Sequence, residues 1–264
     1  MKSALVVTFH KINNTINYLH TIPLYQNKLY TISRYLLEET LQIIPINSCC
    51  TLADFFQKKS GDWIVVTFDD GYISDFEIVV PNLEKLQLKA TFFITVNNIG
   101  KNGYCNKNQL KKMTEMGMEI GSHGLTHRYL TTILKSEVIK EIRSSKHILE
   151  QEFGVSITSF APVGGHFRKW MYETAIEAGY SLFATMIPGK TILTNNTCVL
   201  VRRNHIQAHY SINYTSKLLN GHRGSLLLRN VQYNILYILK LVLGMSFYDW
   251  LKKQLARFTL FILS

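Results

Sequence analysis

Short apolar runs rich in β-branched residues recur along the chain, with helical patterns between them. The clearest runs span residues 5–9, 63–68, 90–96 and 118–120, and weaker ones span 157–161 and 198–201. Runs that are apolar on both faces are typical of parallel strands covered by helices. The alternation of strands and helices from about residue 62 to residue 203 therefore predicts an α/β fold. A doubly wound sheet and a barrel both satisfy this pattern.

The size and charge of the chain indicate a protein with a large core, but they do not identify its binding partner. With 264 residues, 47% of them hydrophobic, the chain is long enough to bury a large core. Its formal net charge of +11 attracts anions such as nucleic acid, lipid headgroups and acidic glycans. The sequence has no RNA-binding signature, zinc-finger spacing or basic region joined to heptads, so no specific nucleic-acid partner is predicted. Its four cysteines form no C-x-x-C pair, which argues against a disulfide framework.

The two ends of the chain suggest a location and a domain boundary. The first residues lack the apolar stretch and cleavage site of a secretory signal, which favours a cytoplasmic protein or one on the cytoplasmic face of a membrane. We predict a main domain over residues 1–222 and a basic, apolar helical appendage over residues 223–264. This appendage lacks the roughly 20 uninterrupted apolar residues that span a bilayer. It either packs on the domain or another subunit, or lies on an anionic membrane surface.

Two adjacent carboxylates follow the apolar run that ends at Phe68. Asp69 and Asp70 precede Gly71 at the carboxyl end of a predicted strand, where α/β folds place their active sites. Neighbouring carboxylates repel each other unless a cation or a proton intervenes. A metal ion would hold one Asp as a ligand and leave the other as a base. A surface turn is the alternative interpretation.

Two histidines four residues apart follow the short run at 118–120. At this spacing His123 and His127 can face one way on a helical turn, and neutral imidazoles are common ligands of zinc and similar metals. Either pair alone is a weak signal. Together, one Asp and two His form a set that leaves positions open for water and substrate. The sequence therefore predicts a divalent-metal site.

These segments resemble the motifs of the polysaccharide deacetylases of the NodB-homology class. The segment TFDDG at 67–71 is similar to the first family motif, SHGLTH at 122–127 to the second, and KATFFI at 89–94 to the strand between them. The resemblance covers residues 62 to about 185, with a looser match from residue 4. It implies a distorted (β/α) barrel, often of seven strands. It also implies a divalent metal, for which we expect zinc, with cobalt or nickel as alternatives.

The resemblance also implies roles for the four motif residues. Asp69 aligns with the catalytic base of the family, whereas Asp70, His123 and His127 align with its metal ligands. The implied reaction is hydrolysis of an N-acetyl group, in which an acid must protonate the leaving amine.

The acid is harder to place. The family usually takes a His from a late Leu-x-His motif, and this chain has no clean match to it. His10 resembles the N-terminal acid of the poly-N-acetylglucosamine deacetylase subgroup and is our preferred candidate. His205 is the alternative.

The third family motif departs from its usual pattern. It commonly begins with an Arg that orients the base, and this chain has Ala161 there instead. Arg202 or Arg203, after the late strand, is the candidate replacement. Because the oxyanion of acyl transfer needs a hydrogen-bond donor, we expect a backbone N–H after Ala161 to supply it, and His166 to line the substrate groove. The candidate oxyanion and substrate segment comprises Pro162, Val163, Gly164, Gly165 and His166.

The sequence thus favours a metal-dependent hydrolase that removes N-acetyl groups from amino sugars of a polysaccharide or lipid-linked glycan. De-N-formylation and O-deacetylation of a glycan are related alternatives that the motifs do not distinguish. A non-catalytic glycan- or membrane-binding protein of the same fold is a further alternative, and the complete set of four motif residues argues against it.

Overall fold

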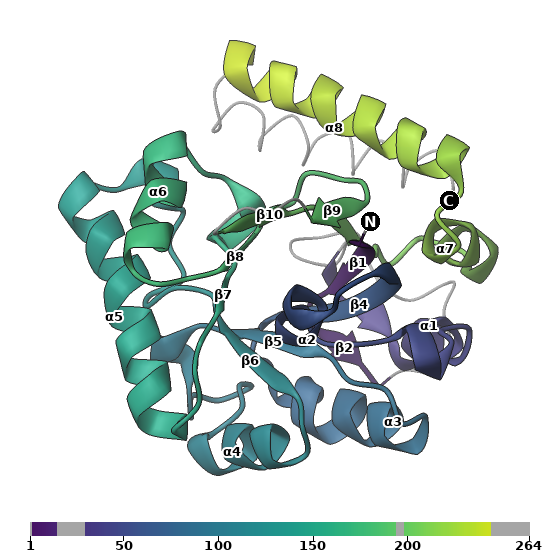
Figure 1. Cartoon of the computed structure of the whole chain (residues 1–264), viewed down its shortest axis with the longest axis horizontal. Helices are drawn as coiled ribbons and strands as arrows, with labels where there is room; N and C mark the ends of the chain where they lie inside the picture. Colours follow the sequence, from purple (N-terminus) through teal and green to yellow (C-terminus); the bar gives the residue numbers. More distant parts are fainter. Residues whose placement is uncertain (1, 15–29, 194–197, 244–264) are drawn as a thin grey trace.

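The computed structural model describes residues 2–14, 30–193 and 198–243, which form an α/β fold around one large sheet (Figure 1). Its strands lie in the order β10-β8-β7-β6-β5-β4-β1-β11 and pair in parallel, while β9 pairs antiparallel with β1. The strands are β1 (Lys2–Phe9), β4 (Gly61–Asp70), β5 (Thr91–Ile94), β6 (Glu119–Ser122), β7 (Ser159–Phe160), β8 (Leu182–Ala184), β9 (Thr191–Leu193), β10 (Val199–Val201) and β11 (Arg203–His205). A separate pair comprises β2 (Ile12–Asn13) and β3 (Ile32–Ser33).

The two strands at the ends of this order are neighbours in the sequence. Only Arg202 separates β10, which pairs with β8, from β11, which pairs with β1. The sheet must therefore curl until its two edges nearly meet. This closure confirms the predicted distorted barrel and rules out the open, doubly wound sheet.

Side chains alternate along the strands between two apolar clusters, because successive residues of a strand point to opposite faces. In β1, Ala4 and Val6 belong to a cluster inside the barrel, whereas Leu5 and Val7 belong to a larger one outside it. Phe55, from the helix at Leu52–Gln57, also joins the inner cluster. The barrel is thus a packed core, and polar side chains further along the inner face occupy its other end.

Most helices cover the outside of the barrel, while α2 lies across its interior in the view along the barrel (Figure 1). The helices are α1 (Arg34–Gln42), α2 (Leu52–Gln57), α3 (Val80–Lys85), α4 (Lys107–Glu115), α5 (Lys135–Phe153), α6 (Lys169–Glu177), α7 (Ile212–Leu219) and α8 (Arg223–Leu243). Local chemistry sets their ends. For example, Asn106 and Gln109 form a reciprocal capping box at the start of α4, and Gly154 ends α5 with a positive φ of 65°.

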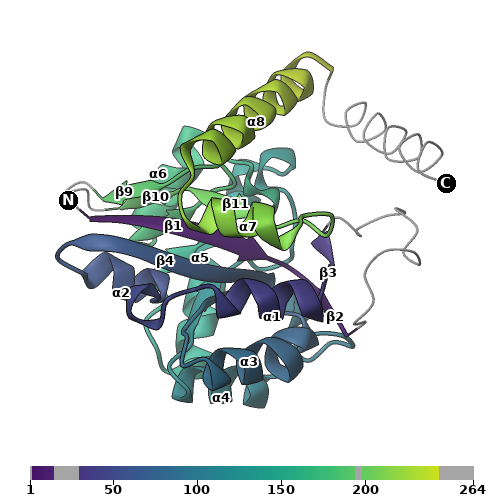
Figure 2. The ribbon, with the colours of Figure 1, turned by 90° about the vertical axis from the view of Figure 1, so that its right-hand side faces the viewer.

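The predicted appendage begins with α8. This helix packs against α7 and extends away from the barrel (Figure 2). Within the part of the chain that the structure describes, no helix is long and apolar enough to cross a bilayer. The rest of the predicted appendage, residues 244–264, lies outside the described residues.

Candidate metal and catalytic site

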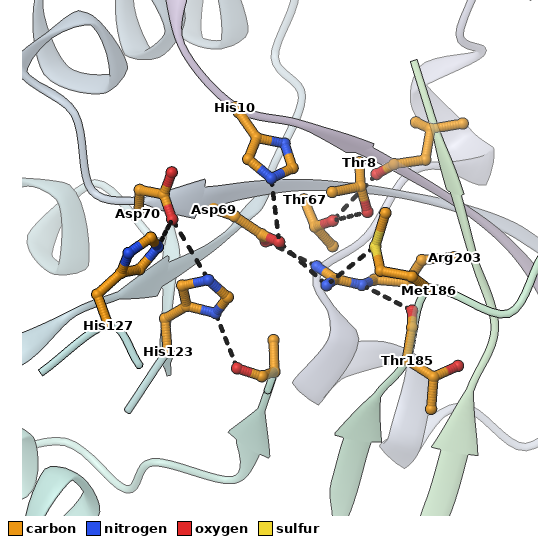
Figure 3. A network of polar contacts seen from close by, with 12 residues as sticks. Thr8, His10, Thr67, Asp69, Asp70, His123, His127, Thr185, Met186 and Arg203 are labelled. Carbon is orange, nitrogen blue, oxygen red and sulfur yellow. Dashed lines mark hydrogen bonds and ion pairs between the residues drawn. The ribbon is translucent and has the colours of Figure 1, made fainter. Parts of the chain in front are cut away.

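The inner face of the barrel becomes polar towards the carboxyl ends of the strands. The alternation that buries Val65 inside β4 also turns Thr67 and Asp69 inwards, and Thr8 lies opposite Thr67 in β1. The two Thr hydroxyl oxygens are 2.7 Å apart. The charged and imidazole groups of the candidate site lie around this Thr pair (Figure 3).

The backbone at the end of β4 directs the two adjacent carboxylates to different partners. Asp70 has a positive φ of 81° and Gly71 one of 77°. A side chain pays a steric cost at such angles, and strained backbone of this kind is often found at functional sites. As a result, Asp69 faces Arg203 and His10, whereas Asp70 faces His123 and His127 (Figure 3).

Asp70, His123 and His127 bring three ligand atoms to one point. Nε2 of His127 lies 2.8 Å and Nε2 of His123 3.3 Å from Oδ1 of Asp70, and the three ligand atoms lie within 4.8 Å of one another. Burial opposes ionisation of Asp70, but the two imidazoles outweigh it and hold the pKa of this carboxyl well below its usual range. An ionised carboxylate and two imidazoles are a suitable donor set for a divalent metal.

Second contacts fix the orientation of the ligands. Nδ1 of His123 lies 2.8 Å from the carbonyl oxygen of Ala161. This contact favours the tautomer that donates from Nδ1 and leaves the Nε2 lone pair for a metal. Asp70, His123 and His127 therefore form a triad that is consistent with a divalent-metal site.

A buried glutamate from α5 holds the loop between the two histidines. The carboxylate of Glu141 accepts hydrogen bonds from the backbone N–H groups of Leu125, at 2.7 Å, and Thr126, at 2.9 Å, and from the Thr126 hydroxyl. Sequence reasoning missed this residue. Its signal was its place three residues after Val138, on the side of the helix that also buries Ile142.

The other half of the site is built around Asp69 and Arg203. The guanidinium of Arg203 donates from Nη1 to Oδ1 of Asp69, at 2.7 Å, and from Nη2 to Oδ2, at 3.0 Å. Both side chains are buried, and the guanidinium lies over the ring of Phe93. Burial opposes ionisation of Asp69, yet Arg203 and the nearby imidazoles hold its pKa below the usual range.

The two candidate replacements for the missing motif arginine have different surroundings. Arg203 contacts Asp69, whereas the guanidinium of Arg202 donates to the carbonyl oxygen of Pro188 and to Oδ1 of Asn230. The inner face of β11 holds Arg203, and neighbouring residues point to opposite sides. The structure therefore brings Arg203, and not Arg202, to the carboxylate.

The two candidate acids lie side by side. The rings of His10 and His205 are 4.9 Å apart, and each also packs against Tyr30. The register of β1 and β11 explains this meeting, because Thr8 pairs with His205. Nε2 of His10 lies 3.9 Å from Oδ2 of Asp69. Burial lowers the pKa of His10, although Asp69 partly opposes that shift.

The candidate oxyanion segment lies beside the triad, because it directly follows Ala161, whose carbonyl oxygen contacts Nδ1 of His123. Residues 163–165 form a short 3-10 turn in which the N–H of Gly165 donates to the carbonyl of Pro162 at 2.8 Å. That N–H is therefore engaged within the turn. The first amides of a helical turn have no partner inside it, which leaves Val163 and Gly164 as the candidate donors. The ring of His166 packs edge-on against that of Tyr129.

Comparisons with known proteins agree with this arrangement. Residues 56–183 match the family model described as polysaccharide deacetylase. The putative polysaccharide deacetylase YxkH of Bacillus subtilis is 29% identical over 133 residues, which cover 50% of this chain and 48% of YxkH. The peptidoglycan-N-acetylglucosamine deacetylase of Bacillus cereus is 31% identical over 118 residues, which cover 44% and 53% of the two chains. The chain spans half or less of the first curated relatives that it matches.

Two solved structures share the fold. The polysaccharide deacetylase BC0361 of Bacillus cereus superposes with a TM-score of 0.71 at 22% identity, over 83% of this chain and 69% of that one. The deacetylase PplD of Streptococcus pyogenes superposes with a TM-score of 0.70 at 19% identity, over 83% and 97%. Residues 56–183 of this chain thus match the polysaccharide deacetylase family, and the nearly closed barrel of the chain is similar to the fold of the solved deacetylases.

Proposed function

We propose that this protein is a metal-dependent hydrolase that removes N-acetyl groups from amino sugars of a polysaccharide or a lipid-linked glycan. The observation that carries this proposal is that two adjacent carboxylates have different partners. Asp70 belongs to the metal triad, while Asp69 is paired with Arg203 and faces the same end of the barrel. Amide hydrolysis needs both an electrophilic centre and a base, and the two carboxylates supply one each.

A divalent metal, which we propose to be zinc, would be held by Asp70, His123 and His127. When bound, it would supply the Lewis acidity that polarises the acetyl carbonyl and activates water. The remaining chemistry falls to the chain. Asp69 accepts the proton of the attacking water, and Arg203 keeps this carboxylate ionised and fixes its orientation.

We propose His10 as the group that protonates the leaving nitrogen. Its Nε2 lies 3.9 Å from Oδ2 of the proposed base Asp69, which places an imidazole beside the reacting group. His205 and Tyr30 pack against the ring and hold it in place. The amides of Val163 and Gly164 are the proposed oxyanion donors, and His166 with Tyr129 lines the sugar groove.

The names of relatives favour an N-acetyl substrate over the alternatives. The matched proteins of Bacillus cereus and Listeria monocytogenes are both called peptidoglycan-N-acetylglucosamine deacetylases. A third relative, from Pseudobutyrivibrio xylanivorans, is a bifunctional xylanase/deacetylase, which keeps an O-acetyl substrate as the second candidate.

The decisive experiment measures acetate and formate release by the full chain loaded with zinc. The panel contains N-acetylglucosamine oligomers, a lipid-linked N-acetylhexosamine, an N-formyl analogue and an O-acetylated oligosaccharide. We expect acetate from the N-acetyl substrates, and no release after chelation. Release from the O-acetylated or N-formyl compound alone would replace the proposed reaction, and release that survives chelation would refute a metal-dependent hydrolase.

A further inference from the structure

The side of α8 that faces the barrel carries several polar side chains. Arg229 and Asn230 face the barrel, where Nη1 of Arg229 donates to the Tyr210 hydroxyl at 2.6 Å and Oδ1 of Asn230 accepts from Arg202 at 2.9 Å. Ser225 is also buried on this side. A surface helix normally buries its apolar side and exposes its polar one. In α8, these polar side chains contact the rest of the protein together with Leu226, which packs against the outer apolar cluster.

Many other apolar side chains of α8 are exposed. A stripe of them, here called the outer stripe, consists of Leu227, Leu228, Val231, Ile235, Ile238 and Val242. From Leu228 onwards these residues recur every three or four positions, and Leu227 lies next to Leu228, so the six share one side of the helix. Each is between 46% and 75% exposed. Scattered exposed apolar residues are ordinary, but a contiguous stripe of this length marks an interaction surface.

The charge around the outer stripe has a single sign. From residue 178 to residue 248 the sequence contains no Asp or Glu, but seven Lys or Arg residues. Three of these are exposed: Lys190 just before β9, Lys217 near the end of α7 and Arg223 at the start of α8. Ile192 and Leu200, on the neighbouring strands β9 and β10, are exposed as well. Lys190 is paired with Asp62 at 2.8 Å, whereas residues 178–248 themselves supply only cations to this surface.

We propose that the outer stripe of α8 docks on the surface of an anionic lipid bilayer. A helix with an apolar side among basic residues can insert that side at the level of the headgroups, while its cations attract anionic lipid. The helix is anchored to the barrel through its opposite side, so docking needs no rearrangement of the fold. In Figure 2 the far end of α8 lies towards the side to which β1 and β4 point, the side of the candidate catalytic site.

A second copy of the chain is the competing occupant. The spacing of Leu228, Val231, Ile235, Ile238 and Val242 also fits a coiled-coil seam. Coiled coils, however, are commonly completed by acidic and basic residues that pair across the seam. Residues 178–248 offer no acidic partner, so two copies would bring like charges together. Charge complementarity therefore favours the bilayer.

The test is sedimentation of the full chain with vesicles. We expect it to pellet with phosphatidylcholine–phosphatidylglycerol vesicles, more weakly with pure phosphatidylcholine vesicles, and less as the salt concentration rises. The double variant Ile235→Gln/Ile238→Gln removes apolar side chains without adding charge, and should lower the apparent partition coefficient about tenfold or more. The matched control, Gln232→Ala/Asn234→Ala, alters the same turns beside the outer stripe and should keep it within about twofold.

Because the substituted side chains are exposed, both double variants should unfold at the temperature of the parent, and thermal melting checks this. Failure of the parent chain to pellet with anionic vesicles would overturn the proposal. So would unchanged pelleting of Ile235→Gln/Ile238→Gln. A dimer of the parent that this variant converts to a monomer would assign the outer stripe to a second copy instead.

Discussion

The two halves of the candidate site contain similar groups but balance their charges differently. In one half, Asp69 is neutralised within the protein by Arg203 through two hydrogen bonds. In the other, Asp70 faces two imidazoles whose ligand atoms converge on one point. A permanently charged guanidinium fixes a carboxylate in one orientation, whereas imidazoles can release their protons and bind an external cation. Two residues adjacent in the chain can therefore take different roles, because the backbone turns between them.

Replacing the proposed base should produce the largest loss. Asp69→Asn keeps the shape of the side chain but removes its ability to accept a proton, so we expect kcat for acetate release to fall by about 10²–10⁴. Asp62→Asn is the matched control at the exposed start of the same strand, where Asp62 pairs with Lys190. It should leave kcat nearly unchanged. Equal kcat values for Asp69→Asn and the parent would remove Asp69 from the reaction.

Breaking the Asp69–Arg203 pair should cost stability as well as activity. Arg203→Met leaves a buried carboxylate without its partner, so we expect the free energy of unfolding in urea to fall by about 3–5 kcal/mol. Arg202→Met makes the same chemical change one residue earlier and should cost about 1 kcal/mol, because it removes hydrogen bonds near the surface. Similar losses for both variants would show that Asp69 does not depend on Arg203.

The identity of the acid can be separated from that of the base by changing the leaving group. His10→Asn should lower kcat on an N-acetyl sugar by about 10² or more, because an amine leaves only with a proton. On p-nitrophenyl acetate, whose leaving group needs no acid, the loss should be only a fewfold. His205→Asn should be mild on both substrates. The reverse ranking of the two variants would make His205 the acid.

Weakening the support of the metal loop should have the smallest of these effects. Glu141→Gln removes the charge that accepts from two loop amides, and we expect the zinc affinity measured by calorimetry to fall by about 10–100-fold. Glu152→Gln, on the same helix and paired with Lys107 at the surface, is the control and should change affinity less than twofold. Equal affinities of the two variants would deny Glu141 a role in holding the histidines.

Local patterns in the sequence were sufficient for parts of this site. The apolar run before Asp69 and the short run before His123 predicted strands, and parallel strands bring such chain-distant ends together. The closure of the barrel was not predictable from local patterns. It depends on β10 pairing with β8 and β11 pairing with β1, although only Arg202 separates β10 from β11. That pairing selects Arg203 over its neighbour and places His205 beside His10.

The most direct test of the division between the two carboxylates is the metal content of matched variants. Asp69→Asn and Asp70→Asn make the same change at adjacent positions, and each purified chain is titrated with zinc by calorimetry. We predict that Asp69→Asn binds one zinc with an affinity within about tenfold of the parent but releases little acetate. Asp70→Asn should lose the zinc itself, because a triad ligand is gone. Loss of zinc binding in Asp69→Asn, or its retention in Asp70→Asn, would contradict the assignment of the two roles.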